Sequence, residues 1–401
     1  MRILFICIFL GLLIWFIQQG PAPVADPAAY VGFLIVLSVF LARIARALRL
    51  PSPVGALAAG FLASNTGLLS GTALTAVGPY AAFAGIWVSL FLGASLTPGQ
   101  ITSRRQRILA VAMAVGAVVS TTSAMLALHL SPIFALNLGL MAGLAAPFWL
   151  HMALPEAHES LRFSLVVTAL SMGLWIVLQA LSGSLFAVEV NRQIIVGLVC
   201  WGAGIEVAVR AFQRVRTHPG RCLVFSVVAF LILVGAQTYT VSPIFLALVT
   251  GLGISVRTGR NRSFLPLQGT LSKFLAPFVL ANFAAHLVPL HQIDLPPADW
   301  HFLIILALAM AGGKILGGLI GSRLTGHPFH YWLPLMPQGL LAATLMSNSL
   351  SILSPSFDRP ADLIAGFVLI AGLAIPVLLS PLQILLGKTE NGLHRGIIRS
   401  G

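Results

Sequence analysis

Long apolar segments recur along nearly the whole chain, and no other feature constrains its fold as strongly. They lie at about residues 3–18, 28–48, 52–70, 73–98, 106–129, 132–152, 162–182, 192–212, 221–237, 241–256, 264–288, 300–322, 329–351 and 361–385. Several approach the ~20 residues that a helix needs to cross a bilayer. Charged residues make up only 8% of the 401, against roughly 25% in soluble domains. These segments predict an all-α polytopic membrane protein, since lipid offers no partners to an open backbone.

The number of spans depends on the first segment. Residues 1–20 form either an N-terminal transmembrane helix or signal anchor, or a cleaved signal peptide. The chain has fourteen spans with this segment and thirteen without it. We expect residues 28–385 to form one transmembrane domain and residues 386–401 to form a short cytoplasmic tail.

The basic residues agree with this count, because cytoplasmic loops of membrane proteins are enriched in Lys and Arg. With the amino terminus inside, 20 of the 23 basic residues lie on the inner side, while Lys314 lies in the membrane and Arg192 and Arg359 lie outside. We therefore expect a multi-pass cell-membrane protein with both termini in the cytoplasm, or with the amino terminus outside if residues 1–20 are removed. The net charge of +13 follows from these loops, so the expected partner is the lipid bilayer and not nucleic acid.

One cation lies inside an apolar span. Residues 306–323 read LALAMAGGKILGGLIGSR, with Lys314 beside Gly313, Gly317 and Gly321 at four-residue spacing. Glycines at this spacing form a smooth helix face for close packing against a second helix. A lysine near the middle of a membrane helix costs about 2.5–3.5 kcal/mol, so it usually faces a partner, a cavity or a transported solute. The alternative is a side chain that snorkels to the interface or is buried in its neutral form.

Two spans carry helix breakers near their middles. Pro147 follows a run of small residues in 132–152, and Pro337 precedes Gln338 in 329–351. Proline removes a backbone donor and clashes with the preceding turn, so helices kink or unwind there. Broken helices at corresponding positions of two halves are typical of the midplane site of a transporter. An ordinary proline kink is the alternative.

Several of these segments resemble one family. They include RALRLPSPVGALAAGFLAS and IWVSLFLGASL early in the chain, then LSKFLAPFVLANFAAHLV, AGGKILGGLIGSRLTG and LMPQGLLAATL. They are similar to motifs of the monovalent cation:proton antiporter superfamily, especially its sodium/proton exchanger and potassium-efflux branch. The resemblance covers about residues 28–385. It implies an antiporter-like fold with inverted repeats, 13 core helices plus one N-terminal helix, crossed broken helices around Pro147 and Pro337, a homodimer, and monovalent cation and proton as substrates without a cofactor.

The ion site departs from the family pattern. Where the resembling exchangers have an acidic pair in the 162–182 span, this chain has Ser171 and Met172, and the arginine of the second break is replaced by Gln338. The helix lysine is kept as Lys314. The ten acids are Asp26, Glu156, Glu159, Glu189, Glu206, Asp294, Asp299, Asp358, Asp362 and Glu390. Nine of them fall in loops or at helix ends, and Glu206 lies toward the inner half of its span, where its four-residue spacing from Arg210 predicts an ion pair.

Other polar residues lie within the spans. The hydroxyl cluster at residues 120–123 is interpreted mainly as bonding back to its own helix, and a lining of the transport pathway is the alternative. Asn282 either links two helices or faces a cavity.

The sequence therefore predicts a secondary active transporter of the antiporter type with a diverged ion site. The candidate transport-core residues are Lys314, Ser171, Met172, Pro147, Pro337, Gln338 and Asn282, with Lys314 as either the titrating group or an anion-binding cation. Two alternatives are a non-transporting membrane subunit that kept the fold, and an organic-anion carrier that uses Lys314. An enzyme is not expected, because the sequence has no nucleophile elbow or P-loop, and no metal site is predicted.

Overall fold

A computed structural model of the chain describes residues 27–66, 71–95, 104–143, 202, 204–215, 217–239, 243–258, 265–286, 295–326, 363 and 367. The regular structure in these ranges is helical, without a strand. The helices are α2 (Pro27–Ala47), α3 (Ser52–Asn65), α4 (Gly71–Ser95), α5 (Arg104–Ala127), α6 (Pro132–Gly143), α10 (His218–Tyr239), α11 (Pro243–Thr258), α12 (Leu265–Ala285) and α13 (Pro297–Thr325). Residues 204–214 form a further helical segment.

Three helices of the described part are long and apolar enough to cross a membrane. They are Ala28–Ala47 of α2, Leu74–Ser95 of α4 and all of α13. Shorter apolar helices accompany them, including α11 and most of α5. A chain with several such helices is a multi-pass membrane protein, as the apolar segments predicted.

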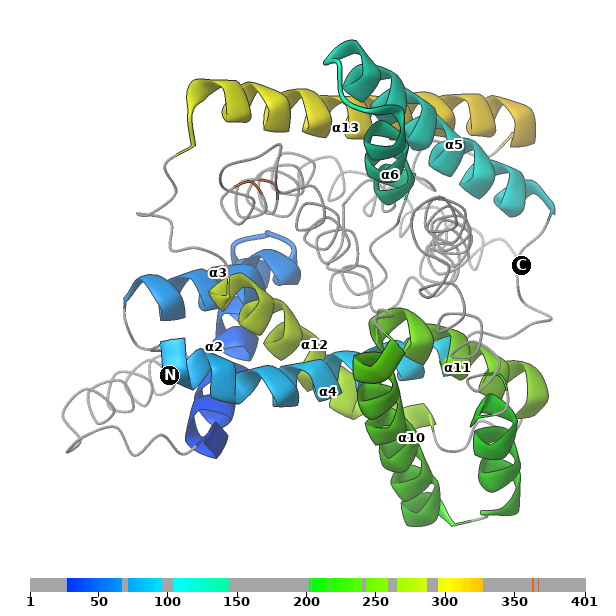
Figure 1. Cartoon of the computed structure of the whole chain (residues 1–401). Coiled ribbons are helices and arrows are strands. Elements are labelled where there is room, and N and C mark those ends of the chain that lie inside the picture. Colours follow the sequence, from blue (N-terminus) through cyan, green and yellow to red (C-terminus); the bar gives the residue numbers. More distant parts are fainter. Residues whose placement is uncertain are drawn as a thin grey trace, which may run out of the picture.

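The described helices form two groups (Figure 1). In the first group, α13 packs along α5, and α6 packs against both. In the second group, α4 contacts α2, α10, α11 and α12, while α3 packs between α2 and α12. We call these the α13 group and the α4 group.

Small residues allow close helix contacts in the α4 group. A methyl group on Gly251 of α11 would lie 3.0 Å from the Cα of Gly93 on α4, and one on Gly60 of α3 would lie 2.8 Å from the Cβ of Ala284 on α12. The aromatic pair Trp87 and Phe225 joins α4 to α10, with ring centroids 4.7 Å apart in an edge-to-face arrangement. Such contacts replace the hydrophobic effect, which does not drive helix association in lipid.

Where the structure describes both ends of a predicted span, the helix agrees with it within a few residues. The segments 52–70, 221–237 and 241–256 are short or carry glycine or proline, as interrupted or tilted helices do. α3 and α11 are short, with 14 and 16 residues, whereas α10 has 22. Each of the three helices is continuous, because Pro219 and Pro243 lie in the first turn, where a missing N–H costs nothing.

Candidate functional site

The helix that carries Lys314 is the longest one described. α13 has 29 residues, begins at Pro297 after Pro296, and ends before Gly326, whose φ of 70° is the left-handed conformation that closes many helices. Asp299 in the first turn and Arg323 in the last turn both have the charge that the helix dipole favours. At 1.5 Å per residue the helix is about 43 Å long, and Lys314 lies about 25 Å from its start, near the middle of the apolar stretch.

The glycines of α13 pack against α5. A methyl group on Gly313 would lie 2.5 Å from the carbonyl oxygen of Gly116 and 2.8 Å from the Cα of Ala117. One on Gly317 would lie 2.7 Å from the Cα of Met113, and one on Gly321 would lie 3.1 Å from the Cα of Leu109. Successive glycines along α13 contact residues progressively closer to the start of α5. The two helices are therefore antiparallel, and their backbones nearly touch. We call this contact surface of Gly313, Gly317 and Gly321 the glycine face.

Lys314 lies beside the glycine face and is buried, with 3% of its surface exposed. Met310, Ala307 and Leu303 occupy the same side of α13 and are buried too. The opposite side carries exposed aliphatic residues, namely Ile304, Leu308, Ile315 and Leu319. A lysine that snorkels to the interface would be exposed, so its burial does not fit that alternative. The ammonium group points into the protein.

Thr121 of α5 occupies a comparable position. It shares one stripe of that helix with Met113, Ala117 and Met125, all buried, while Val111, Val115, Val119 and Leu126 on the other side are exposed. Gly313 contacts Ala117 and the Cβ of Ser120, so Thr121 and Lys314 each directly follow a residue of the same helix contact. Because the helices are antiparallel, Thr121 and Lys314 follow this contact in opposite directions, and both lie on protein-facing sides of their helices.

The hydroxyl of Thr121 is buried and makes no hydrogen bond, and the same holds for Thr122. Several other buried hydroxyls of the described part bond back to their helices, such as Ser89 to the Gly85 carbonyl at 2.8 Å and Thr325 to the Gly321 carbonyl at 2.7 Å, whereas those of Ser255 and Ser322 make no hydrogen bond. The expectation that the 120–123 cluster bonds back to its own helix is thus wrong for Thr121 and Thr122. A buried polar atom without a partner costs about 1–3 kcal/mol and usually has a functional reason.

The other predicted transport-core residues divide into two sets. Asn282 of α12 is buried, and its side-chain oxygen makes no hydrogen bond, which favours a cavity over a link between helices. It belongs to the α4 group, unlike Lys314 and Thr121. The remaining candidates lie outside the described residues: Pro147, Ser171, Met172, Pro337 and Gln338.

Glu206, the acid in the inner half of a predicted span, pairs with a neighbouring arginine. Glu206 Oε1 accepts a hydrogen bond from Arg210 Nε at 3.1 Å, which confirms the pair predicted from their spacing. Both side chains are partly exposed, so this pair lies on the helix surface and not in the protein interior. Within the described residues no cluster of His, Cys, Asp and Glu has the form of a metal site.

Comparisons with known proteins extend this description. No family model matches the sequence, and no curated protein matches it. Among solved structures, the electron microscopy map of the sodium proton antiporter MjNhaP1 from Methanocaldococcus jannaschii superposes with a TM-score of 0.63 at 17% identity, covering 91% of this chain and 96% of that one. The structure of the same antiporter at pH 8 gives a TM-score of 0.59 at 18% identity, with coverages of 89% and 95%. Over nearly its whole length, this chain has the fold of a sodium proton antiporter.

Proposed function

We propose that this protein is a secondary active transporter of the cation:proton antiporter type with a diverged ion site. The observation that carries the proposal is the burial of Lys314 halfway along a membrane-length helix in a chain with this fold. A cation there lowers stability by roughly 2.5–3.5 kcal/mol, so a purely structural position would favour an apolar residue. The cost is explained if the charge acts on a transported species.

The two helix groups supply the moving parts. In this proposal the α13 group moves against the α4 group and carries Lys314 between inner and outer access, as in transporters built from inverted repeats. A monovalent cation and a proton travel in opposite directions. The cation and the Lys314 ammonium repel each other, so loss of the lysine proton accompanies cation binding. The Thr121 hydroxyl offers an oxygen ligand on the buried side of α5, the helix that packs along α13.

The fold supports the remaining features of the proposal. It is that of an antiporter, for which we infer a homodimer in the cell membrane with no catalytic step and no cofactor. The broken helices predicted around Pro147 and Pro337, together with Ser171, Met172 and Gln338, would complete the site.

A second candidate is a carrier for an organic anion. It is favoured by the buried hydroxyl of Thr121, because a hydroxyl can donate a hydrogen bond to a carboxylate that pairs with Lys314. The two candidates differ in the sign of the charge on the solute and share Lys314.

Flux measurements in proteoliposomes test the proposal. An internal pH dye reports proton movement after addition of sodium, potassium or lithium, and uptake of a radiolabelled dicarboxylate is measured in parallel. We expect cation-dependent proton flux that falls roughly ten- to hundredfold in Lys314→Gln, since a hydrogen bond to a charged group contributes about 1.5–3 kcal/mol. Lys273→Gln is the matched control, because Lys273 is an exposed lysine of α12.

Three results would contradict the proposal in distinct ways. Equal flux in Lys314→Gln and wild type would remove Lys314 from the mechanism. Dicarboxylate uptake without cation-dependent proton flux would favour the anion carrier. No flux of any solute above empty liposomes would favour a non-transporting subunit.

A further inference from the structure

The contact between α5 and α13 is reciprocal. A methyl group on Gly116 would meet the carbonyl oxygen of Gly313 and lie 3.0 Å from the Cα of Gly317. One on Gly313 would lie 2.5 Å from the carbonyl oxygen of Gly116 and 2.7 Å from the Cβ of Ser120. Each glycine thus meets the other glycine and the residue four places beyond it, as in a contact with two-fold symmetry. For two antiparallel helices, that axis is perpendicular to the plane that contains them.

This symmetry makes Ala117 the counterpart of Lys314. Each directly follows the paired glycine of its helix, and the two-fold axis returns each face of the helix pair to itself. The two side chains therefore lie on the same face of the pair. Their levels along the helices agree as well, because Gly116 is level with the middle of the turn 313–317 and Gly313 with the middle of the turn 116–120. One step along each antiparallel helix then brings Ala117 and Lys314 level.

The face that these two residues share also carries an unpartnered hydroxyl. Ala117 and Thr121 are both 0% exposed and lie one turn apart on the buried stripe of α5, and the Thr121 hydroxyl makes no hydrogen bond. Side chains on a helix lean toward its start, so we expect the stem of Lys314 to lean from the level of Ala117 toward that of Thr121. An alanine at this place leaves room beside the cation that a longer side chain would fill.

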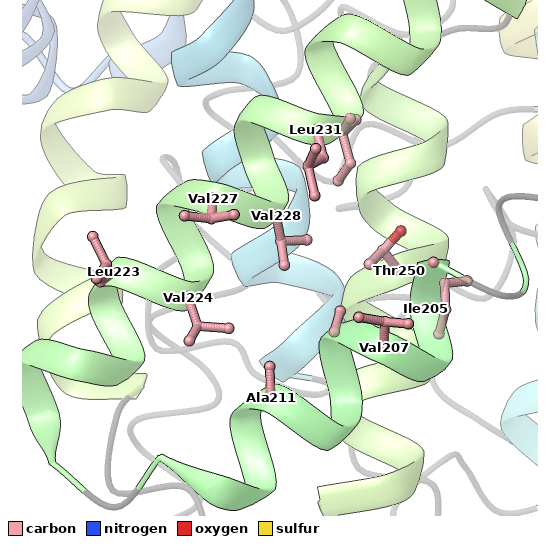
Figure 2. A pocket seen from close by; sticks show the side chains of 12 residues that line it. Ile205, Val207, Ala211, Leu223, Val224, Val227, Val228, Leu231 and Thr250 are labelled. Atoms are coloured by element: carbon pink, nitrogen blue, oxygen red, sulfur yellow. The ribbon is translucent and has the colours of Figure 1, made fainter.

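The groove shown in Figure 2 lacks this combination. It lies between the helical residues 204–214 and α10, holds about 360 Å³ and is lined by aliphatic side chains, with Thr250 as the polar residue of the lining. The Thr250 hydroxyl donates to the Leu246 carbonyl at 2.7 Å, unlike that of Thr121. The groove therefore suits an apolar occupant, and the space beside Lys314 suits a charged solute.

We propose that Ala117 is a wall residue of the solute site: it faces the same interior space as Lys314 and Thr121, and its small side chain leaves the room that the solute occupies. The identity of the solute rests on the proposed function, whereas the position of Ala117 follows from the helix contact. A space that a charged solute enters is also reached by water. A thiol at this position should therefore react with a charged reagent, because the reaction needs an accessible thiolate.

Cysteine modification of the purified protein in neutral detergent tests the position of Ala117. In a background where Cys7, Cys200 and Cys222 are replaced by serine, Ala117→Cys and Val119→Cys are treated with a trimethylammonium methanethiosulfonate, and intact mass reports the reaction. Val119 is the matched control, because it lies two residues further along α5 with 58% of its surface exposed. We expect Ala117→Cys to react about tenfold faster or more, since a cationic reagent does not enter the apolar layer around Val119.

Added solutes connect the position to transport. Sodium, potassium or lithium, each compared with choline at equal ionic strength, should slow the modification of Ala117→Cys if the cation enters the same space. A dicarboxylate is tested in parallel.

Moving the lysine tests the shared space in a second way. Lys314→Ala combined with Ala117→Lys returns a cation to the same face at the same level, so proteoliposome flux should recover to within about tenfold of wild type. Lys314→Ala combined with Val119→Lys is the control and should stay as inactive as Lys314→Ala alone, because its lysine lies on the exposed side of α5.

The outcomes separate this inference from the proposed function. Equal modification rates at positions 117 and 119, or reaction of Ala117→Cys only after denaturation, would overturn the inference and make Ala117 a packing residue. No recovery by the relocated lysine, in a variant with wild-type gel filtration and helical content, would also overturn it. Fast modification of Ala117→Cys without any flux in wild type would support the inference and contradict the proposed function. Slowing by the dicarboxylate alone would support Ala117 as a wall residue of an anion carrier.

Discussion

At the scale of single residues, the candidate site depends on two polar side chains that an ordinary membrane helix would not bury. Lys314 could be found from the sequence, because a lone charge in an apolar span stands out. Thr121 could not, because threonines in membrane helices usually bond back to their own carbonyls, and only coordinates show that this hydroxyl does not. The helical periodicity of α5 would have placed Thr121 on the buried stripe, but it would not have shown that the hydroxyl lacks a hydrogen-bond partner.

Thr121→Val tests whether the hydroxyl acts on the solute. Valine has the same shape and removes a buried polar atom without a hydrogen bond, so we expect the protein to be about 1 kcal/mol more stable. Transport should fall about three- to tenfold if the hydroxyl contacts the solute. Thermal unfolding and proteoliposome flux, measured on the same preparation, check the two effects.

Thr325→Val is the matched control for this substitution. Thr325 is buried in α13 with its hydroxyl bonded to the Gly321 carbonyl, so valine there should not increase stability. A Thr121→Val protein that is more stable and transports at the wild-type rate would make Thr121 a packing residue only.

At the scale of helices, the glycine face determines where Lys314 lies. The four-residue spacing predicted a close helix contact, but it could not identify α5 as the partner, because α5 presents Gly116 and small residues of no conspicuous period. The bounds of the helices were predictable within a few residues, since each apolar segment must span or nearly span the hydrocarbon. The continuity of α3, α10 and α11 could not be predicted, because glycine in a membrane helix allows close packing as readily as it interrupts the helix.

Gly313→Ala tests the contact between α5 and α13. The added methyl would lie 2.5 Å from the Gly116 carbonyl oxygen, and backbone cannot move aside as a flexible side chain can. We expect a loss of about 1–3 kcal/mol in stability, typical of overpacking. Thermal unfolding in one detergent provides the measurement.

Gly312→Ala is the neighbouring control, because nothing lies within 4 Å of a methyl group there. It should leave stability unchanged or slightly raised, since alanine favours a helix over glycine by about 1 kcal/mol. Equal destabilisation by the two substitutions would mean that the close approach of α5 and α13 is not what Gly313 provides.

At the scale of the whole molecule, structural comparisons support the fold, whereas the membrane topology is inferred from the sequence alone. The antiporter fold was indicated by loose motifs and agrees with the structural comparisons despite identities of 17–18%. The orientation in the membrane depends on the distribution of Lys and Arg alone. Residues such as Ser171 and Gln338, where the chain departs from the family pattern, lie outside the described part, so the diverged site remains a prediction from sequence.

Cysteine labelling in intact cells tests the orientation. In a background where Cys7, Cys200 and Cys222 are replaced by serine, Thr217→Cys places a thiol in the basic turn before α10, and His301→Cys places one near the start of α13. Both positions are exposed. We expect a membrane-impermeant maleimide to label residue 301 in intact cells and residue 217 only after the membrane is opened. The reverse labelling pattern would mean that every loop lies on the side of the membrane opposite to the predicted one.

The length of α13 has a consequence for how membranes act on this protein. A helix of about 43 Å exceeds the ~30 Å of hydrocarbon in a bilayer, so it tilts or projects beyond it. Because its glycines lie against the backbone of α5, the two helices lean together and not separately. A thicker or thinner bilayer would change that shared inclination and move the Lys314 ammonium toward one surface or the other. Acyl-chain length thereby becomes a means of adjusting the depth of the only lysine in this span.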